Sequence, residues 1–203
     1  MIKKLFITCA IFAVTTGLGF AEVEVGKAAP NFSLPDTNGK THNLADLKGK
    51  YVVLEWYQPD CPFVRKHYRS GNMQSLQKEY TAKGVVWLSI DSSAPGEEGN
   101  YPAVKLNEFA AKDAAARTAL LMDPSGDVGR LYDAKTTPDM YIIDPKGNLV
   151  YKGAIDNKRS TDLDDVKSAT NYVKTALDAV LAGKSVSTTS TQPYGCSVKY
   201  SSK

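Results

Sequence analysis

Apolar residues fall into short runs separated by polar turns, and two of these runs are apolar at nearly every position. They span residues 51–57 (Tyr-Val-Val-Leu-Glu-Trp-Tyr) and 85–90 (Val-Val-Trp-Leu-Ser-Ile). β-Branched and aromatic residues with little alternation are typical of strands buried on both faces. Residues 61–83 between them place apolar side chains four positions apart, which predicts a helix that Gly71-Asn72 kinks or divides. The order predicts a right-handed parallel crossover, with residues 51–57 as the central strand.

The rest of the pattern predicts smaller elements around this crossover. Turns rich in Pro, Asn and Gly separate pairs of short apolar segments, which is typical of antiparallel hairpins. The expected elements are hairpins at 31–34 with 41–44 and at 140–144 with 149–153, a surface loop at 92–102, a helix at 104–112, a strand at 119–123 and an amphipathic helix at about 163–181. Together they predict an α/β fold with a mixed sheet flanked by helices, an N-terminal hairpin and a C-terminal tail.

The two ends of the chain differ from the middle. Lys3 and Lys4 precede an apolar run at residues 5–14, and Gly19-Phe20-Ala21 follows as a small-residue cleavage pattern. This order is typical of a secretory signal peptide, because a membrane span needs about 20 apolar residues. We therefore expect a signal peptide at 1–21, export, most simply to the periplasm, one domain at 22–183, and a polar Ser/Thr-rich tail at 184–203.

Composition narrows the class of protein without assigning a function. Removal of residues 1–21 takes away two lysines and no acidic residue, so the formal net charge falls from +3 to +1. A nearly neutral chain has no basic surplus to attract nucleic acid or an anionic membrane, and we expect neither as a partner. The remaining length suits one domain with a full core that needs no disulfide to fold.

Two cysteines, Cys61 and Cys196, remain once the leader that contains Cys9 is removed. The pair suggests redox chemistry, although a structural disulfide is the ordinary alternative in an exported chain. Cys61 stands where a buried strand ends and a helix begins, so free amides and the positive end of the helix dipole can stabilise a thiolate. The alternative is a buried, inert thiol, and its neighbours Asp60 and Pro62 argue against burial.

Charged residues follow Cys61 on the predicted helix. Arg65, Lys66 and Arg69 would add positive potential near the thiol, and each is also expected to be a solvated surface charge. His67 lies six residues after Cys61, on another side of any helix, which gives little support to a Cys–His dyad or a metal site. We expect His67 to be partly exposed, and we predict no metal and no cofactor.

Three segments carry a resemblance to a known family. They are residues 55–64 (Glu-Trp-Tyr-Gln-Pro-Asp-Cys-Pro-Phe-Val), 137–144 (Thr-Pro-Asp-Met-Tyr-Ile-Ile-Asp) and 194–200 (Tyr-Gly-Cys-Ser-Val-Lys-Tyr). In this order the chain resembles the thioredoxin superfamily over about residues 25–200, within its redoxin branch of peroxiredoxin-like proteins, related to alkyl hydroperoxide reductase and thiol-specific antioxidant. The resemblance implies a thioredoxin-like three-layer fold.

The resemblance also implies roles for particular residues. Cys61 matches the nucleophilic cysteine of the thioredoxin motif. Pro138 matches the cis-proline that faces this cysteine and, with Thr137 and Pro62, would bind an extended substrate. Glu55 matches the buried acid that helps to move protons during disulfide exchange, and a buried acid there would suit a general base.

The departures from the family pattern are equally informative. Val64 replaces the second cysteine of the thioredoxin motif, so Cys61 has no partner on its own helix. Gln58 stands where peroxiredoxins place a threonine or serine, and their arginine near Pro138 is also absent. Thr136 stands where some relatives carry a further cysteine. Cys196 is therefore the only candidate for a resolving thiol, which turnover requires.

Several functions remain open from the sequence. The preferred one is thiol-disulfide exchange through Cys61, resolved by Cys196 of the same chain or of a partner subunit in a homodimer. The substrate would be a disulfide-containing protein, a small thiol or a peroxide, with a separate reductant. The alternatives are a peroxiredoxin-like antioxidant peroxidase and a non-enzymatic binding protein with an inert bridge. We expect a flexible tail to favour a labile role for Cys196, and Asp156 and Asn157 to cap turns.

Overall fold

A mixed five-stranded sheet forms the centre of the protein, of which the computed structural model describes residues 23–202; the expected signal peptide lies outside them. The strand order is β5 (Ala119–Met122), β4 (Val86–Asp91), β3 (Val52–Trp56), β7 (Asp139–Ile143) and β8 (Leu149–Gly153). β3 is central, parallel to β4 and antiparallel to β7. The predicted parallel arrangement of the two apolar strands is confirmed, and so is the predicted hairpin at 140–144 with 149–153, since β7 pairs antiparallel with β8.

Strand residues alternate between two cores. Val53, paired with Trp87, faces one hydrophobic cluster, whereas the next pair, Leu54 and Leu88, faces the other. Every residue of β3 and β4 is buried. Continuous apolar runs therefore form the centre of the sheet, as the sequence predicted, because successive side chains point to opposite and equally covered faces.

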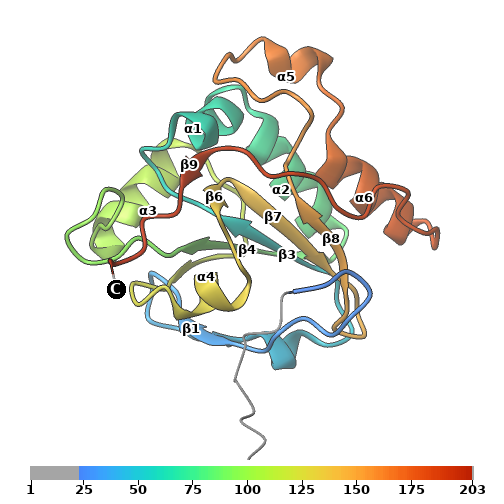
Figure 1. Ribbon diagram of the computed structural model, residues 1–203, viewed down its shortest axis with the longest axis horizontal. Coiled ribbons are helices and arrows are strands. Elements are labelled where there is room, and N and C mark those ends of the chain that lie inside the picture. The colour runs from blue at the N-terminus through green and yellow to red at the C-terminus, as the bar shows by residue number, and fades with distance from the viewer. Residues whose placement is uncertain (1–22, 203) are drawn as a thin grey trace, which may run out of the picture.

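Two different layers cover the sheet (Figure 1). Helices α1 (Pro62–Arg69), α2 (Asn72–Ala82), α3 (Ala103–Lys112) and α6 (Tyr172–Leu181) cover one face. The hairpin of β1 (Ser33–Pro35) and β2 (Thr41–Asn43), the 3₁₀ helix η1 (Leu44–Leu47) and the short helix α4 (Asp127–Leu131) cover the other. Gly71, at a φ of 76°, divides α1 from α2 as predicted, since this left-handed conformation suits glycine.

The predicted helix over 163–181 is wrong in its first half. A short helix α5 (Asp165–Ser168) ends at Ala169, which is extended, and α6 begins only after Asn171. The side-chain oxygen of Asn171 accepts a hydrogen bond from the amide of Lys174 at 2.8 Å, which caps α6. Helix α4 lies in a segment without a predicted helix.

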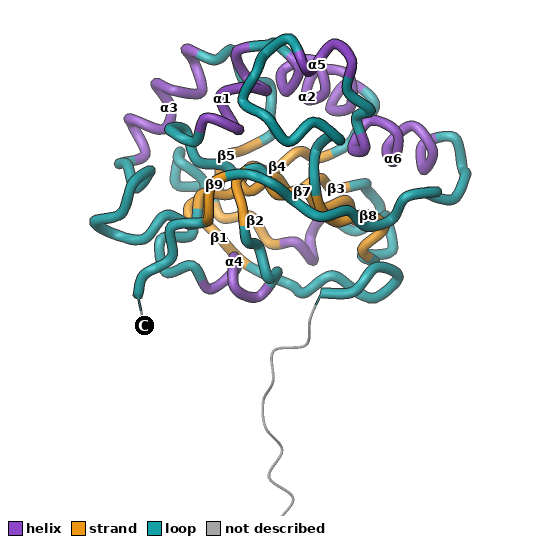
Figure 2. Tube along the Cα trace, turned by 45° about the horizontal axis from the view of Figure 1, so that its top comes forward, coloured by secondary structure: helices purple, strands orange, loops and turns teal. Residues whose placement is uncertain are grey.

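The expectation of a flexible tail is also wrong. The chain after α6 crosses the front of the sheet in Figure 2 and passes through strand β9 (Cys196–Ser197). β9 pairs antiparallel with β6 (Thr136–Thr137), with Cys196 opposite Thr137. A run of Ser and Thr residues is typical of a linker. In this tail, however, the backbone of Thr189 and the backbone and hydroxyl of Thr191 hydrogen-bond to the body of the domain.

Candidate active site

Cys61 occupies the N-terminal cap of helix α1, directly after the turn that leaves β3. Its carbonyl oxygen accepts a hydrogen bond from the amide of Arg65 at 2.9 Å, and Pro62 takes the first helical position. The expectation of an accessible Cys61 is wrong, since only 2% of the residue is exposed. The tail and Thr137 cover the sulfur.

The structure brings the two cysteines together within one chain. Cys61 Sγ lies 2.8 Å from Cys196 Sγ and 2.9 Å from the carbonyl oxygen of Thr137. Both cysteines are free thiols. One sulfur comes from a helix start and the other from a tail strand, so only the docked tail makes this contact.

The environment of Cys196 keeps it protonated. Burial, followed by the hydrogen bond and the charge of Cys61, raises the pKa of Cys196 to about 12, whereas Lys199 has a smaller lowering effect. Cys196 therefore holds its proton at neutral pH beside a reduced Cys61. Once Cys61 has entered a disulfide, the contributions of reduced Cys61 to the raised pKa of Cys196 are removed, which makes Cys196 a better nucleophile.

The residues expected to bind substrate lie in different environments. Thr137 and Pro138 are buried and joined by a cis peptide bond, as the resemblance implied, whereas Pro62 is exposed. The hydroxyl of Thr137 is buried without a hydrogen-bond partner among residues 23–202. A side chain at Gly195 would overlap the carbonyl of Thr137, so glycine at this position lets the tail approach.

Glu55 is fully buried, as the resemblance implied. Its carboxylate accepts hydrogen bonds from Tyr68 Oη at 2.9 Å, Trp87 Nε1 at 2.8 Å, Ser89 Oγ at 2.7 Å and Gln77 Nε2 at 3.3 Å. Within the described residues Glu55 makes no hydrogen bond to Cys61. All five residues of this Glu55 cluster come from the central strands and from α1 and α2.

A second buried polar group, the Asp156 cluster, joins the tail to helix α1. It comprises Asp156, Tyr194, Lys66 and His67. Tyr194 donates a short hydrogen bond from its hydroxyl to Asp156 Oδ1. Lys66 Nζ and His67 Nε2 lie 3.8 Å and 4.0 Å from Asp156 Oδ2. Because Tyr194 is two residues before Cys196, this cluster fixes the strand that carries the second thiol.

Sequence reasoning missed most of the Asp156 cluster. Lys66 and His67 were expected at the surface, but both are buried, and burial lowers the pKa of His67 to about 4. Asp156 does cap a turn, since it accepts a hydrogen bond from the amide of Lys158 at 2.9 Å. Arg65 and Arg69 are exposed, as expected. The only available signal was Tyr194 in the carboxyl-terminal motif.

Residues 23–202 contain neither a metal-binding cluster nor a membrane-spanning helix. No group of three or more His, Cys, Asp or Glu side chains in this part of the chain is arranged to hold a metal ion. No helix within it is long and apolar enough to cross a membrane.

A family model described as AhpC/TSA family matches residues 25–152, more than half of the chain. The chain belongs to the AhpC/TSA family. This stretch contains Cys61 and Pro138 but ends before Asp156 and Cys196, so the family match covers one half of the cysteine pair.

Named relatives and a solved structure agree with this assignment of the AhpC/TSA protein. The thiol-disulfide oxidoreductase ResA of Bacillus subtilis (strain 168) is 30% identical over 141 residues, which are 70% of each chain. The thioredoxin-like protein YneN of the same strain is 31% identical over 149 residues, 70% of this chain and 81% of its own. The structure of a hypothetical protein from Sinorhizobium meliloti 1021 superposes with a TM-score of 0.74 at 25% identity, covering 90% of this chain and 97% of its own. The predicted thioredoxin-like fold and oxidoreductase class are confirmed.

Proposed function

We propose that this AhpC/TSA protein carries out thiol-disulfide exchange, with Cys61 as nucleophile and Cys196 of the same chain as resolving thiol. The observation that carries the proposal is the 2.8 Å contact between the two sulfur atoms. The relative named as a thiol-disulfide oxidoreductase supports the same reaction class. Val64 leaves Cys61 without a partner on its own helix, and the docked tail supplies one.

The reaction runs in two exchange steps. The Cys61 thiolate attacks one sulfur of a substrate disulfide, forms a mixed disulfide and releases the other substrate sulfur as a thiolate. Cys196 then loses its proton to solvent and attacks Cys61 Sγ, which releases the second substrate thiolate and leaves a Cys61–Cys196 disulfide. The substrate gains two electrons and the protein loses two, so an external dithiol must reduce the pair for the next cycle.

The surrounding residues have distinct proposed roles. The backbone at Thr137-Pro138 and the exposed ring of Pro62 would contact the substrate beside Cys61. The Glu55 carboxylate lies beneath helix α1, and its hydrogen bonds with Tyr68 and Gln77 connect it to both helices next to the site. Glu55 would take part in proton movement through this buried network.

Export remains part of the proposal. The leader pattern at residues 1–21 supports transfer to an oxidising compartment such as the periplasm, where a disulfide between Cys61 and Cys196 would persist. Detection of a mature protein that begins at Glu22 would support this assignment, and a retained leader on the active protein would contradict it.

A peroxidase is the second candidate, because the matching family model is described as AhpC/TSA. In that reaction Cys61 would attack a peroxide, become a sulfenic acid and condense with Cys196 with loss of water. Gln58 in place of a threonine or serine argues against it, and the Gln58 side-chain oxygen is buried without a hydrogen-bond partner among the described residues.

The two candidate functions differ in which reaction of Cys61 is faster, exchange with a disulfide or oxidation by a peroxide. The rates of Cys61 oxidation by hydrogen peroxide and of Cys61 exchange with a model disulfide would be measured by mass spectrometry. The unmodified protein would be compared with Cys196→Ser, and Cys61→Ser would serve as the inactive control. We expect fast exchange, slow reaction with peroxide, and a mixed disulfide trapped on Cys61 in Cys196→Ser. Fast peroxide reaction with slow exchange would instead establish the peroxidase.

A further inference from the structure

Residues 189–200, here called the C-terminal strap, are anchored to the body along their whole length. Their backbone contacts include Thr191 N to Lys152 O at 3.1 Å, Val198 N to Lys135 O at 3.1 Å and Ala94 N to Lys199 O at 2.8 Å. The strap also contributes the Tyr194 hydroxyl to the buried Asp156 cluster. Thr191, Tyr194, Val198 and Lys199 thus tie the strap to the body at several points.

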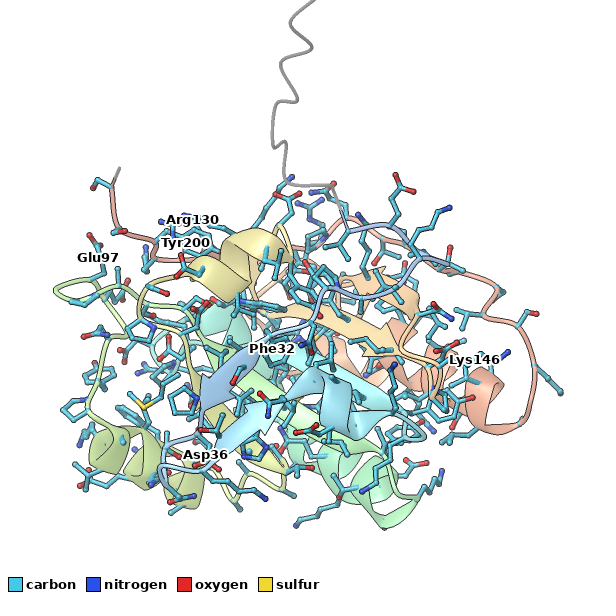
Figure 3. The ribbon with its side chains drawn as sticks, turned by 90° about the horizontal axis from the view of Figure 1, so that it is seen from below. Phe32, Asp36, Glu97, Arg130, Lys146 and Tyr200 are labelled. Carbon is cyan, nitrogen blue, oxygen red and sulfur yellow. The ribbon has the colours of Figure 1, made fainter. Side chains whose placement is uncertain are left out.

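The body of the protein has recesses that fit the strap. A side chain at Gly153 would overlap the carbonyl of Thr191, and one at Gly129 would overlap the hydroxyl of Tyr200. Figure 3 shows Tyr200 beside Arg130 on α4, and the Arg130 guanidinium lies 4.6 Å from the centre of the Tyr200 ring. The docked strap is therefore part of the packed structure at both of its ends.

The strap occupies the edge that faces Cys61. β9 forms an antiparallel pair with β6, and Cys196 lies directly opposite Thr137, whose carbonyl is also 2.9 Å from Cys61 Sγ. An extended polypeptide that delivered a disulfide to Cys61 along Thr136–Thr137 would need the same backbone groups and the same space. A small disulfide has no polypeptide backbone to pair with this edge.

The Asp156 cluster holds this competing strand in place. The Tyr194 hydroxyl donates to a carboxylate that is 2% exposed, in a site that also contains Lys66 at 1% and His67 at 0% exposure. A hydrogen bond to a charged acceptor in a water-excluded site is among the stronger ones in proteins. The Tyr194 ring also packs edge-on against Phe63, with ring centres 5.8 Å apart.

We propose that the C-terminal strap is a built-in competitor for the Thr136–Thr137 edge, with Tyr194 as the positioning residue that keeps it docked. Small disulfides react at Cys61 with little movement of the strap, whereas polypeptide disulfides react only after β9 leaves β6. This proposal rests on the proposed exchange reaction and adds a selection by substrate size.

The first exchange step measures this competition directly. In the Cys196→Ser background, which stops at the mixed disulfide, the rates of reaction with insulin and with 2-hydroxyethyl disulfide would be compared. Tyr194→Phe removes one hydroxyl and keeps the ring. Tyr51→Phe is the matched control, because it removes a hydrogen bond, 3.2 Å long, whose acceptor is Val180 O on helix α6 and not a residue of the strap.

We expect Tyr194→Phe to raise the ratio of the insulin rate to the small-disulfide rate about tenfold. This factor is typical of the removal of a hydrogen bond to a charged group. Tyr51→Phe should leave the ratio within about twofold. Amide hydrogen exchange at Val198 should quicken in Tyr194→Phe and not in Tyr51→Phe, since that amide donates to Lys135 O in the docked strap.

Two results would contradict the proposed competition between the strap and polypeptide substrates. A third result would contradict the exchange reaction on which that proposal rests. Equal insulin and small-disulfide rates in the Cys196→Ser protein, or an unchanged ratio in Tyr194→Phe despite faster exchange at Val198, would reject the competitor alone. No reaction with either disulfide, in this protein and in the unmodified one, would reject the proposed exchange function.

Discussion

Two buried carboxylates beside helix α1, those of Glu55 and Asp156, have similar burial and different connections. Glu55 is 0% exposed and accepts four hydrogen bonds, and Asp156 is 2% exposed and accepts two, from Tyr194 and from the amide of Lys158. The donors to Glu55 all belong to the sheet and to the helices that pack on it. The groups around Asp156 come from α1, from the loop after β8 and from the strap. A carboxylate between the sheet and the helices packed on it stabilises the core, whereas one shared with the strap fixes the position of the strap.

Removal of the Glu55 carboxylate should have the largest effect. Glu55→Ala would leave the Trp87 indole, the Ser89 hydroxyl and the Tyr68 hydroxyl buried without their acceptor. Each such group costs about 1–3 kcal/mol, so we expect a loss of about 4 kcal/mol in the free energy of unfolding, measured by urea denaturation.

Glu79→Ala is the control for this change, because the Glu79 side chain is 38% exposed and forms ion pairs with Lys83 and Lys174. It should alter the free energy of unfolding by less than about 1 kcal/mol. If Glu55→Ala also lowered the free energy of unfolding by less than about 1 kcal/mol, a stabilising role of the buried Glu55 carboxylate would be contradicted.

Titration of His67 should have the next largest effect. Burial lowers its pKa to about 4, so the folded protein leaves His67 neutral while the unfolded chain takes up a proton below about pH 6.5. The contribution of His67 therefore makes stability fall as the pH falls from about 6.5 to 4, by up to roughly 3 kcal/mol.

Two other buried groups act in the opposite direction over an overlapping range. Burial raises the pKa of Asp139 to about 7 and that of Asp91 to about 6, so their contributions to stability fall as the pH rises from about 4 to 7. Comparison of the unmodified protein with His67→Gln isolates the histidine. The difference in unfolding free energy between them should shrink as the pH falls from 7 to 4. Parallel curves would contradict a neutral, buried His67.

Asp156→Asn should have the smallest effect on global stability, about 2 kcal/mol, because the amide keeps the shape of the carboxyl and loses its charge. We expect it to slow formation of the Cys61–Cys196 disulfide about tenfold after Cys61 has reacted. The disulfide would be followed by quenched mass spectrometry, with the exposed Asp162→Asn as control. An unchanged rate of disulfide formation in Asp156→Asn would contradict the role of this carboxylate in holding the strap in position.

The parts of the fold that could be predicted from the sequence are local. Continuous apolar runs identified β3 and β4, and Gly71 marked the break between α1 and α2. The position of Cys61 at the start of a helix followed from the same strand and helix boundaries. Each of these features depends on neighbouring residues, whose spacing the sequence displays directly.

The features that could not be predicted depend on contacts between distant segments. Lys66 and His67 look like surface residues of a helix, but both are buried, and Asp156 and Tyr194 from distant segments lie against them. A Ser/Thr-rich tail lacks the periodicity of a packed element, since its docking uses backbone hydrogen bonds, Tyr194 and Tyr200. The candidate site could not be predicted in full, because it consists of residues more than 100 positions apart, such as Cys61 and Cys196, that only the fold brings together.

The central claim is that Cys61 and Cys196 of one chain form the redox pair. Its most direct measurement is peptide mapping under non-reducing conditions after reaction of the reduced protein with one equivalent of a model disulfide, at low and high protein concentration. We predict a single Cys61–Cys196 disulfide in monomers, formed to the same extent at both concentrations. A disulfide between chains that increases with concentration, or a Cys61 that remains joined to the model thiol while Cys196 stays free, would contradict the account.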